Sequence, residues 1–358
     1  MYEVTVLMTV FNGMPYLAEA VDSILCQSLS NFKFVIVDDG SSDGTADYLN
    51  AISDPRVSII RQENGGTAAA ANHGLENVTT RFVARMDADD ISLPTRLSKQ
   101  LAFMKQNSDV GVLGTQVVPV GSAGHGKSLA LPSDHEELFS DMMNCKHGLA
   151  HSSVMIDANR LKSIGGYWSL RLIDDWDMML RMGEISRLAN LDEVLVHYRV
   201  HSGSLNGTGM LRMQRSIAYA VELARRRQAD MPPISYEAFV EALDTAPFLH
   251  RLAERARVFA LTQYRIAVAD QCGGRKIAGT LRLGFAALCS PRRTFDRVSR
   301  MMRFSGRPQP PSRPQVSART ANNEIALDGT HPPTISVTSE NDTESKTGSL
   351  SSPVKNAR

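Results

Sequence analysis

The chain has 358 residues, of which 42% are hydrophobic and 22% are charged. A chain of this size and composition can bury a substantial core, and its length predicts one large domain with an appendage. The 39 basic and 38 acidic residues leave a net charge of +1, so the overall balance gives no reason to expect nucleic acid as a partner.

The cysteines are far apart in the sequence, which argues against a zinc knuckle and a Cys-x-x-Cys redox pair. We expect reduced, structural thiols at Cys26, Cys145, Cys272 and Cys289. The N-terminus shows no basic leader with a cleavage site, and no stretch approaches the roughly 20 apolar residues of a membrane helix. These features predict a cytoplasmic protein that reaches a membrane only through its surface, at the inner face.

Short β-rich segments alternate with segments of helical periodicity in the first part of the chain. The β-rich segments cover residues 4–10, 34–37, 57–60 and 82–86. The first two are almost continuously apolar, as in strands that are covered on both faces. The pattern predicts an α/β fold with a Rossmann-like, mostly parallel sheet flanked by helices.

The composition changes twice further along the chain. We expect a main body at residues 1–205, followed by a helical appendage at residues 206–305, where Arg, Ala and Leu recur at helical spacing. Residues 306–358 hold seven of the 16 prolines and no aromatic residue. This last segment, rich in Pro, Ser and Thr, is predicted to be a disordered tail.

The predicted appendage contains a strongly basic stretch. Residues 275–307 carry many Arg and Lys side chains and a single acid, Asp296, interleaved with apolar residues such as Leu281 and Phe285. One interpretation is a solvated helical face whose apolar side packs on the main body. The other is a basic amphipathic surface that makes peripheral contact with an anionic membrane. The sequence leaves both interpretations open.

Two groups of acids directly follow predicted strands. Asp38 and Asp39 follow residues 34–37, and the segment Asp87-Ala88-Asp89-Asp90 follows residues 82–86. Ligands of open α/β sheets bind outside the carboxyl ends of the strands, where these acids are expected to meet. Their mutual repulsion favours a cation, and Mg²⁺ or Mn²⁺ with a nucleoside diphosphate fits the oxygen ligands. The alternative is that each group is a solvated loop or a helix cap.

Together these segments resemble the family 2 glycosyltransferases, which have the glycosyltransferase A fold. The resemblance covers residues 4–205, and its motifs recur in the order of the family. Those motifs are the segments LMTVFNG at 7–13, VDDGSSDGT at 37–45, NGG at 64–66, ANHG at 71–74 and MDADD at 86–90.

The resemblance implies a role for each matching residue. Thr9 and Phe11 would wall the base pocket, and an aspartate of the pair Asp38-Asp39 would accept a hydrogen bond from the base, with uracil favoured. Asp87 would lie near the ribose, and Asp89 would hold the metal ion. The complete set of expected donor-binding residues is Thr9, Phe11, Asn12, Asp38, Asp39, Asn64, Asn72, Asp87 and Arg199. The family often has Pro where this chain has Thr9, and Arg or Lys where it has Gly66.

A second cluster, Asp174-Asp175-Trp176-Asp177, resembles the family's Glu-Asp segment with aspartate in place of glutamate. The position of the catalytic base falls on Asp175, whose carboxylate could take the proton of an acceptor hydroxyl. The alternative is a helix cap. His151 is expected to be a structural residue. The segment YRVHSGS at 198–204 resembles the family's closing loop. Within it, Arg199 would contact the diphosphate or form an ordinary surface pair.

The resemblance implies an inverting transfer of a sugar from a nucleotide-sugar donor to a glycan or lipid-linked acceptor, in cell-envelope polysaccharide or glycolipid synthesis. The chain lacks the Gln-x-x-Arg-Trp motif of processive members, which favours transfer of single sugars. Two alternatives stay open: a nucleotidyltransferase that makes sugar nucleotides, and a non-catalytic sugar-nucleotide-binding regulator. A lysine-containing phosphate loop and a Gly-x-Gly-x-x-Gly motif are both missing after the first strand, which disfavours the nucleotidyltransferase and a Rossmann dehydrogenase.

Overall fold

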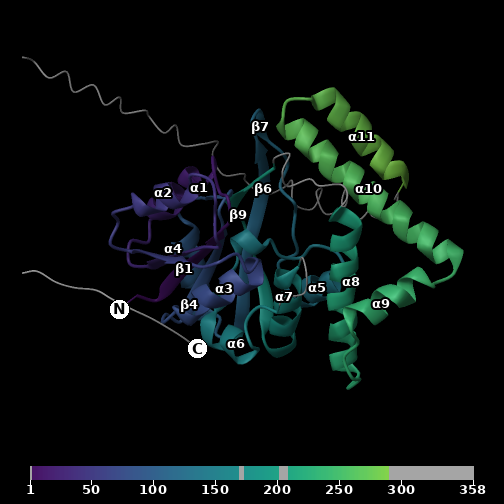
Figure 1. The fold of residues 1–358 in the computed structure, drawn as a ribbon, viewed down its shortest axis with the longest axis horizontal. Coiled ribbons are helices and arrows are strands. Elements are labelled where there is room, and N and C mark those ends of the chain that lie inside the picture. The colour runs from purple at the N-terminus through teal and green to yellow at the C-terminus, as the bar shows by residue number, and fades with distance from the viewer. Residues whose placement is uncertain (1, 169–172, 201–208, 290–358) are drawn as a thin grey trace, which may run out of the picture. The chain divides into compact units, whose positions relative to one another are not determined.

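A computed structural model describes residues 2–168, 173–200 and 209–289 (Figure 1). The chain divides into two compact units, residues 1–311 and 312–358, and every described residue belongs to the first. The predicted tail, the end of the predicted appendage from residue 290, and residues 201–204 of the predicted closing loop lie outside the described residues.

A nine-stranded sheet forms the centre of the first unit (Figure 1). Its strand order is β3-β2-β1-β4-β8-β6-β9-β5, and β7 pairs with β6. The parallel half, which the sequence predicted, comprises β3 (Val57–Arg61), β2 (Lys33–Asp38), β1 (Val4–Val10) and β4 (Phe82–Asp87). The carboxyl ends of these four strands therefore share one edge of the sheet.

The other half of the sheet is mixed. Strand β8 (Met155–Asp157) is antiparallel to both β4 and β6 (Val110–Gly121), and β9 (Arg187–Arg199) is parallel to β6. Two short strands, β5 (Ile91–Ser92) and β7 (Gly124–His125), pair antiparallel with β9 and β6. Because β8 is antiparallel to both neighbours, β6 runs in the same direction as β4. The carboxyl ends of β6 and β9 thus lie at the same edge as those of β1, β2 and β4.

Each face of the sheet is covered by its own apolar core. In the central strands alternate side chains enter opposite cores, with Leu7 and Val35 in one and Met8 and Ile36 in the other. The helices of the first core are α3 (Thr67–Glu76), α5 (His135–Met143), α6 (Ala158–Ser163), α7 (Asp174–Ile185) and α8 (Gly209–Gln228). Those of the second are α1 (Leu17–Leu25), α2 (Thr45–Asn50) and α4 (Arg96–Gln106). Burial on both faces explains why the central strands are continuously apolar.

After α8 the described chain is helical, as the sequence predicted, with α9 (Tyr236–Asp244), α10 (Phe248–Cys272) and α11 (Lys276–Cys289). Helix α8 contributes Ile217, Ala220 and Val221 to the first core, so the body includes this helix. Helices α10 and α11 pack against each other as a hairpin (Figure 1). Within the described ranges, no helix is both long and apolar enough to cross a membrane.

Candidate active site

The loops after β1 and β2 are joined to each other at the carboxyl edge of the sheet. The backbone N–H of Asn12 donates to Ser41 Oγ at 2.9 Å, and Asn12 Oδ1 accepts from the backbone N–H of Ser42 at 2.8 Å. Asn12 has a φ of +51°, a left-handed conformation that asparagine tolerates better than most residues. Phe11 lies beside it with 53% of its surface exposed. The aromatic ring is therefore available to a ligand at this edge.

Asp39 holds the loop that leads from β3 to α3. Its Oδ1 accepts from Gln62 Nε2 and the N–H of Gly65, both at 2.8 Å, and its Oδ2 accepts from the N–H of Gly66 at 2.9 Å. Asn64 Nδ2 donates to the backbone carbonyl of Asp39 at 3.0 Å. A carboxylate offers about four acceptor positions, so these three bonds leave about one for a further donor.

Asp38 also supports the backbone of this edge. It is almost completely buried, its Oδ1 accepts from the N–H of Ser41 at 2.9 Å, and its Oδ2 lies 3.4 Å from Arg61 Nε. Both aspartates of the pair, together with Asn64, thus shape the loops around the expected base pocket. Their direct contact with a base stays a prediction.

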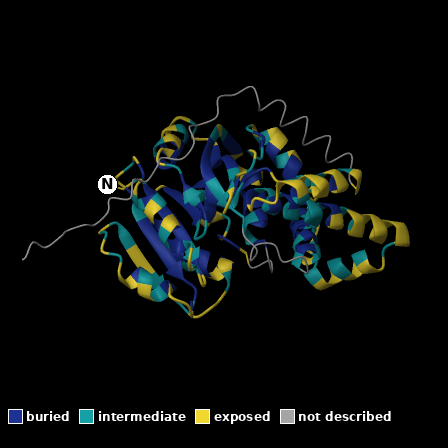
Figure 2. Cartoon of the chain, turned by 90° about the horizontal axis from the view of Figure 1, so that it is seen from above, coloured by how far each residue is buried: buried dark blue, intermediate teal, exposed yellow. Residues whose placement is uncertain are grey.

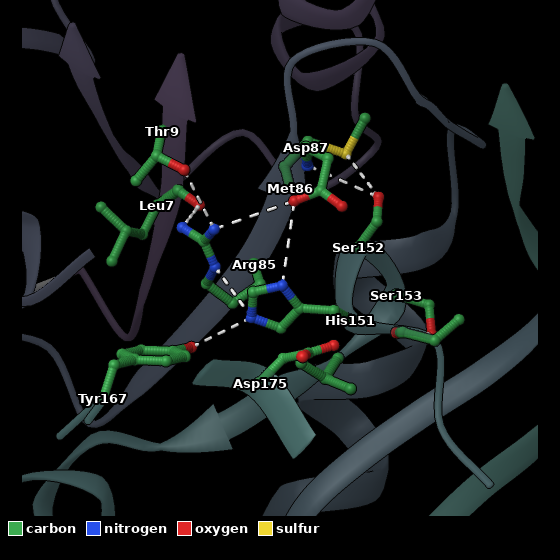
Figure 3. Close-up of polar contacts among 12 residues, drawn as sticks. Leu7, Thr9, Arg85, Met86, Asp87, His151, Ser152, Ser153, Tyr167 and Asp175 are labelled. Atoms are coloured by element: carbon green, nitrogen blue, oxygen red, sulfur yellow. Dashed lines mark hydrogen bonds and ion pairs between the residues drawn. The ribbon is translucent and has the colours of Figure 1, made fainter. Parts of the chain in front are cut away.

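A buried arginine, which the sequence analysis did not single out, links the end of β1 to the acids (Figure 3). Arg85 in β4 has no exposed surface. Its guanidinium donates to the carbonyl of Leu7 at 2.9 Å, Thr9 Oγ1 at 3.3 Å and His151 Nε2 at 3.3 Å, and lies 3.8 Å from Asp87 Oδ1. A charged residue inside an otherwise apolar strand was the available signal, because a buried cation requires polar partners.

His151, in the short 3-10 helix His151–Ser153, is held neutral with a defined tautomer. Burial, reinforced by the positive charge of Arg85, lowers the pKa of His151 well below its ordinary value. Because Arg85 can only donate, His151 Nε2 must accept, and it also lies 3.3 Å from Tyr167 Oη. The ring proton is therefore on Nδ1, which lies 3.9 Å from Asp87 Oδ1. His151 contacts both Tyr167 and the acid side of the site.

Tyr167 is fixed by Asn72. Asn72 Nδ2 donates to the carbonyl of Tyr167 at 2.7 Å, and the N–H of Tyr167 donates to Asn72 Oδ1 at 2.9 Å. The amide of Asn72 uses one donor and one acceptor on the protein backbone, and its expected contact with the donor stays a prediction. We therefore assign Asn72 a positioning role: it holds Tyr167, which in turn contacts His151.

The acids after β4 lie on the expected donor side of the site. Half-buried Asp87 has its pKa raised to about 6, chiefly by burial, with the charges of Asp89 and Asp174 adding to the effect and that of Arg85 opposing it. Burial, together with the charges of Asp87 and Asp89, also raises the pKa of Asp90. Several carboxylates close enough to disfavour one another's ionisation are what a bound cation would stabilise.

Arg199, at the end of β9, holds this acidic loop in place. Its backbone N–H donates to Asp90 Oδ1 at 2.8 Å, and its Nε donates to the carbonyl of Asp89 at 2.7 Å. Its Nη2 pairs with Glu19 Oε2 at 2.5 Å, and the guanidinium lies over the ring of Tyr16. Of the two roles that the sequence left open, the structure presents pairing with a protein carboxylate. Contact between Arg199 and a diphosphate stays a prediction.

Asp175 lies in the first turn of α7. Its Oδ1 accepts from the N–H of Trp176 at 2.9 Å. Burial is the main cause that raises the pKa of Asp175 to about 7, followed by the charges of Asp174 and Asp87. A carboxylate with a pKa near neutrality is well suited to accept a proton from a hydroxyl group.

The acids of β4 and α7 meet in one site although they are far apart in the sequence. Figure 3 shows the carboxylates of Asp87 and Asp175 on either side of the His151 ring. The charge of Asp87 contributes to the raised pKa of Asp175, which agrees with this proximity. Among the described residues, no three His, Cys, Asp or Glu side chains are grouped so as to hold a metal ion by themselves. A Mg²⁺ or Mn²⁺ site needs only one or two carboxylates when phosphate oxygens supply the remaining ligands, so the residues present fit such an ion.

Comparison with known proteins identifies the family of this chain. Residues 5–155 match the model of the family described as glycosyl transferase family 2. The putative glycosyltransferase EpsE of Bacillus subtilis is 33% identical over 231 residues, which cover 62% of this chain and 79% of EpsE. The chain belongs to glycosyl transferase family 2. The family assignment from sequence motifs is thereby confirmed.

Two further proteins resemble this glycosyltransferase. The O-antigen biosynthesis glycosyltransferase WbnJ of Escherichia coli is 31% identical over 208 residues, covering 56% of this chain and 81% of WbnJ. A solved structure of the mannosyltransferase PcManGT from Pyrobaculum calidifontis, in complex with GDP-Man and Mn²⁺, aligns with a TM-score of 0.50 and 18% identity. The alignment covers 86% of this glycosyltransferase and 87% of PcManGT, and supports the predicted glycosyltransferase A fold.

Proposed function

We propose that this glycosyltransferase transfers one sugar from a UDP-sugar to the hydroxyl group of a glycan or lipid-linked acceptor, with inversion of the anomeric carbon. The observation that carries the proposal is the meeting of Asp87, at the end of β4, with Asp175, at the start of α7, on the two sides of His151. The proposal assigns Asp87 to the donor side of the site and Asp175, as the base, to the acceptor side. The name of WbnJ, an O-antigen biosynthesis glycosyltransferase, supports a role in polysaccharide synthesis.

The donor nucleotide is proposed to bind along the carboxyl ends of β1, β2 and β4. Phe11 offers an exposed ring for stacking, and Thr9 and Asn12 complete the wall of the base pocket. The acceptor position left on Asp39 suits the N–H of a uracil ring. Asp87 would accept hydrogen bonds from the ribose hydroxyls, and its ion pair with Arg85 orients its carboxylate.

Asp89 is proposed to hold Mg²⁺ or Mn²⁺. Oxygen ligands and a neighbouring carboxylate, Asp87, match what these hard cations prefer. When bound, the ion would stabilise the negative charge that develops on the departing diphosphate. A bound cation would also offset the repulsion between the acids that lie together on this loop.

Asp175 is proposed to be the general base. Its carboxylate removes the proton of the acceptor hydroxyl, while the hydroxyl oxygen forms a bond to the anomeric carbon and the bond from that carbon to the diphosphate oxygen breaks. Attack from the side opposite the leaving group inverts the configuration. His151, held neutral between Asp87 and Asp175, adds no competing positive charge beside the base.

A screen of donors tests the proposal. UDP-, GDP- and dTDP-sugars are added with Mn²⁺, and the rise in Tm identifies the donor, since a ligand that binds only the native state stabilises it. Turnover is then measured as release of the nucleoside diphosphate. The first assay uses water as the acceptor, and later assays add candidate acceptors. The variant Asp175→Asn should bind the donor like the wild type and lose turnover, with Asp22→Asn, an exposed acid of α1, as the matched control.

The outcome of the screen separates the alternatives. Wild-type protein that binds a UDP-sugar but never turns it over would instead be a sugar-nucleotide-binding regulator. Release of pyrophosphate from a nucleoside triphosphate and a sugar phosphate would identify a nucleotidyltransferase. Full turnover by Asp175→Asn would remove Asp175 from the mechanism.

A further inference from the structure

Helix α11 presents its large apolar side chains to solvent. Ile277, Leu281 and Leu288 follow one another at intervals of four and seven residues, which places them on one helical face. They are 80%, 71% and 82% exposed. The buried positions of the same helix are the small residues Gly279 and Ala286. The helix thus packs on the protein through small residues and directs its most apolar face outward.

Helix α10 extends this apolar face. Phe248, Leu252 and Phe259 recur at the same intervals on one side of the helix and are 68%, 51% and 48% exposed. The rings of Phe259 and Phe285 meet edge to face at 5.9 Å, which joins the exposed residues of the two helices. We call this set the hairpin face: Phe248, Leu252, Phe259, Ile277, Leu281, Phe285 and Leu288. Figure 2 shows exposed positions along this helical part of the chain.

The hairpin is also strongly basic. Residues 248–289 contain seven Arg or Lys and two Asp or Glu side chains. One of the two acids, Asp270, is shared by Arg275 at 2.6 Å and Arg282 at 3.1 Å, so it neutralises only part of their charge. Exposed apolar residues combined with an excess of positive charge match an anionic lipid surface. A second copy of the hairpin would carry the same positive charge and would repel it.

The hairpin is attached at the edge of the sheet that carries the active site. Ala123, in the turn after β6, donates its N–H to the carbonyl of Cys272 at 2.9 Å, and Cys272 Sγ contacts the carbonyl of Pro119 at 3.7 Å. An added Cβ at Gly121 would lie 2.8 Å from Cys272 Cβ, so the end of α10 closely approaches the end of β6. The carboxyl end of β6 shares its edge with that of β4, where Asp87 lies.

We propose that the hairpin face binds the surface of a membrane that contains anionic lipids. The apolar residues enter the boundary between headgroups and acyl chains, and the surrounding Arg and Lys side chains bind the lipid phosphates. Because the hairpin adjoins the active-site edge, this contact brings the site to acceptors that are anchored in the membrane. This last step rests on the proposed function, whereas the membrane contact itself does not.

Vesicle flotation with the full chain tests the contact. Vesicles of phosphatidylcholine alone are compared with vesicles that contain about 30% phosphatidylglycerol, at low and high salt. The wild type should float with the anionic vesicles and be released by salt. The double variant Leu281→Gln and Leu288→Gln, which alters two exposed side chains, should bind at least about tenfold more weakly. The matched control is Ile185→Gln and Met231→Gln, two apolar residues of similar chemistry, 52% and 51% exposed outside the hairpin, which should float like the wild type.

Three results would overturn the proposal. They are failure of the wild type to bind anionic vesicles, unchanged binding by the hairpin variant, and equal loss in the control variant. A different result would assign the hairpin face to a second copy of the chain. In that case the wild type would be a dimer, the hairpin variant would be a monomer, and neither would bind vesicles. The Tm of each variant shows that it is folded.

Donor hydrolysis in solution distinguishes this proposal from the proposed function. Release of UDP into water needs the active site but no membrane, so the hairpin variant should match the wild type. Hydrolysis without vesicle binding would refute the membrane contact and leave the proposed function intact. Vesicle binding by a protein that neither binds nor hydrolyses nucleotide-sugars would refute the function and leave the contact intact.

Discussion

Arg85 fixes the tautomer of His151. The guanidinium Nε donates to His151 Nε2 at 3.3 Å, and a guanidinium cannot accept a hydrogen bond, so the imidazole must carry its proton on Nδ1. That N–H lies 3.9 Å from Asp87 Oδ1. One buried arginine therefore determines which group His151 presents to the donor side of the site.

We expect the variant His151→Gln to keep the fold and lose activity. The amide oxygen of Gln can still accept from Arg85 and Tyr167, but no rigid ring holds its amide N–H in the position of Nδ1 opposite Asp87. A carboxylate misplaced by about 1 Å can cost about a hundredfold in kcat/KM. Steady-state kinetics and Tm are measured together, with His250→Gln, an exposed histidine of α10, as the control. Unchanged kinetics would limit His151 to packing.

Turnover should rise with pH through the titration of Asp175. The base must be ionised to accept a proton, and the pKa of Asp175 is raised to about 7 by burial, by Asp174 and by Asp87. We expect kcat/KM for the donor to fall about tenfold for each pH unit below that value and to level off above it. A profile that is flat across this range would exclude Asp175 as the titrating base.

The same shift predicts how the stability of the variant Asp175→Asn depends on pH. The pKa is 3.8 in the unfolded chain and about 7 in the folded protein, so the folded state binds more protons between these values. Stability contributed by protonated Asp175 is therefore lost as pH rises through this window. Asn carries no such penalty, so Asp175→Asn should raise Tm more at about pH 8 than at about pH 4.5. An equal effect at both pH values would contradict the burial of this carboxyl group.

The sequence contained most of the information for the sheet and for the acids. Continuous apolar runs identified the central strands because both faces of the sheet are covered, and Asp38 and Asp87 each end the strand that their position indicated. The edge strand β3, half exposed, was found from its β-branched residues. Parallel strands have their carboxyl ends at one edge of the sheet, so the strand pattern alone predicts that these acids lie at the same edge.

The contacts that hold the site residues in place could not be predicted in the same way. Arg85 and His151 are 66 residues apart, and Asn72 and Tyr167 are 95 residues apart, so no local pattern records these pairs. The motif predicted that Asn72 binds the donor, and this stays a prediction; its hydrogen bonds to the backbone of Tyr167 had no signal in the sequence. A side chain that satisfies distant polar groups has the same sequence signal as one that binds a ligand.

Removal of the carboxylate of Asp89 should separate binding from turnover. The negative charge that a metal ion would stabilise develops mainly as the diphosphate leaves, so Asp89→Asn should lower kcat by about a thousandfold. Binding of the nucleotide without Mn²⁺, measured by calorimetry, should change little. Chelation of the metal should reduce the wild type to the level of the variant. Wild-type rates in the presence of a chelator would show that transfer does not need the ion.

Gly166 is predicted to be essential for the conformation that holds Tyr167. It has a φ of +68°, and an added Cβ would lie 2.5 Å from Asn72 Oδ1. The left-handed conformation alone costs a residue with a side chain about 1–2 kcal/mol, and displacement of Asn72 would add to this value. We expect Gly166→Ala to lower the free energy of unfolding in urea by at least about 2 kcal/mol and to reduce turnover, because Tyr167 then no longer supports His151.

Gly284 provides the matched control for this substitution. It lies within α11, and no atom lies within 4 Å of an added Cβ. Alanine favours a helix interior over glycine by roughly 0.5–1 kcal/mol, so Gly284→Ala should be neutral or stabilising with unchanged turnover. Equal stability of the two variants would mean that the contact between Gly166 and Asn72 does not constrain the site. Tyr167 would then owe its position to packing in the first core.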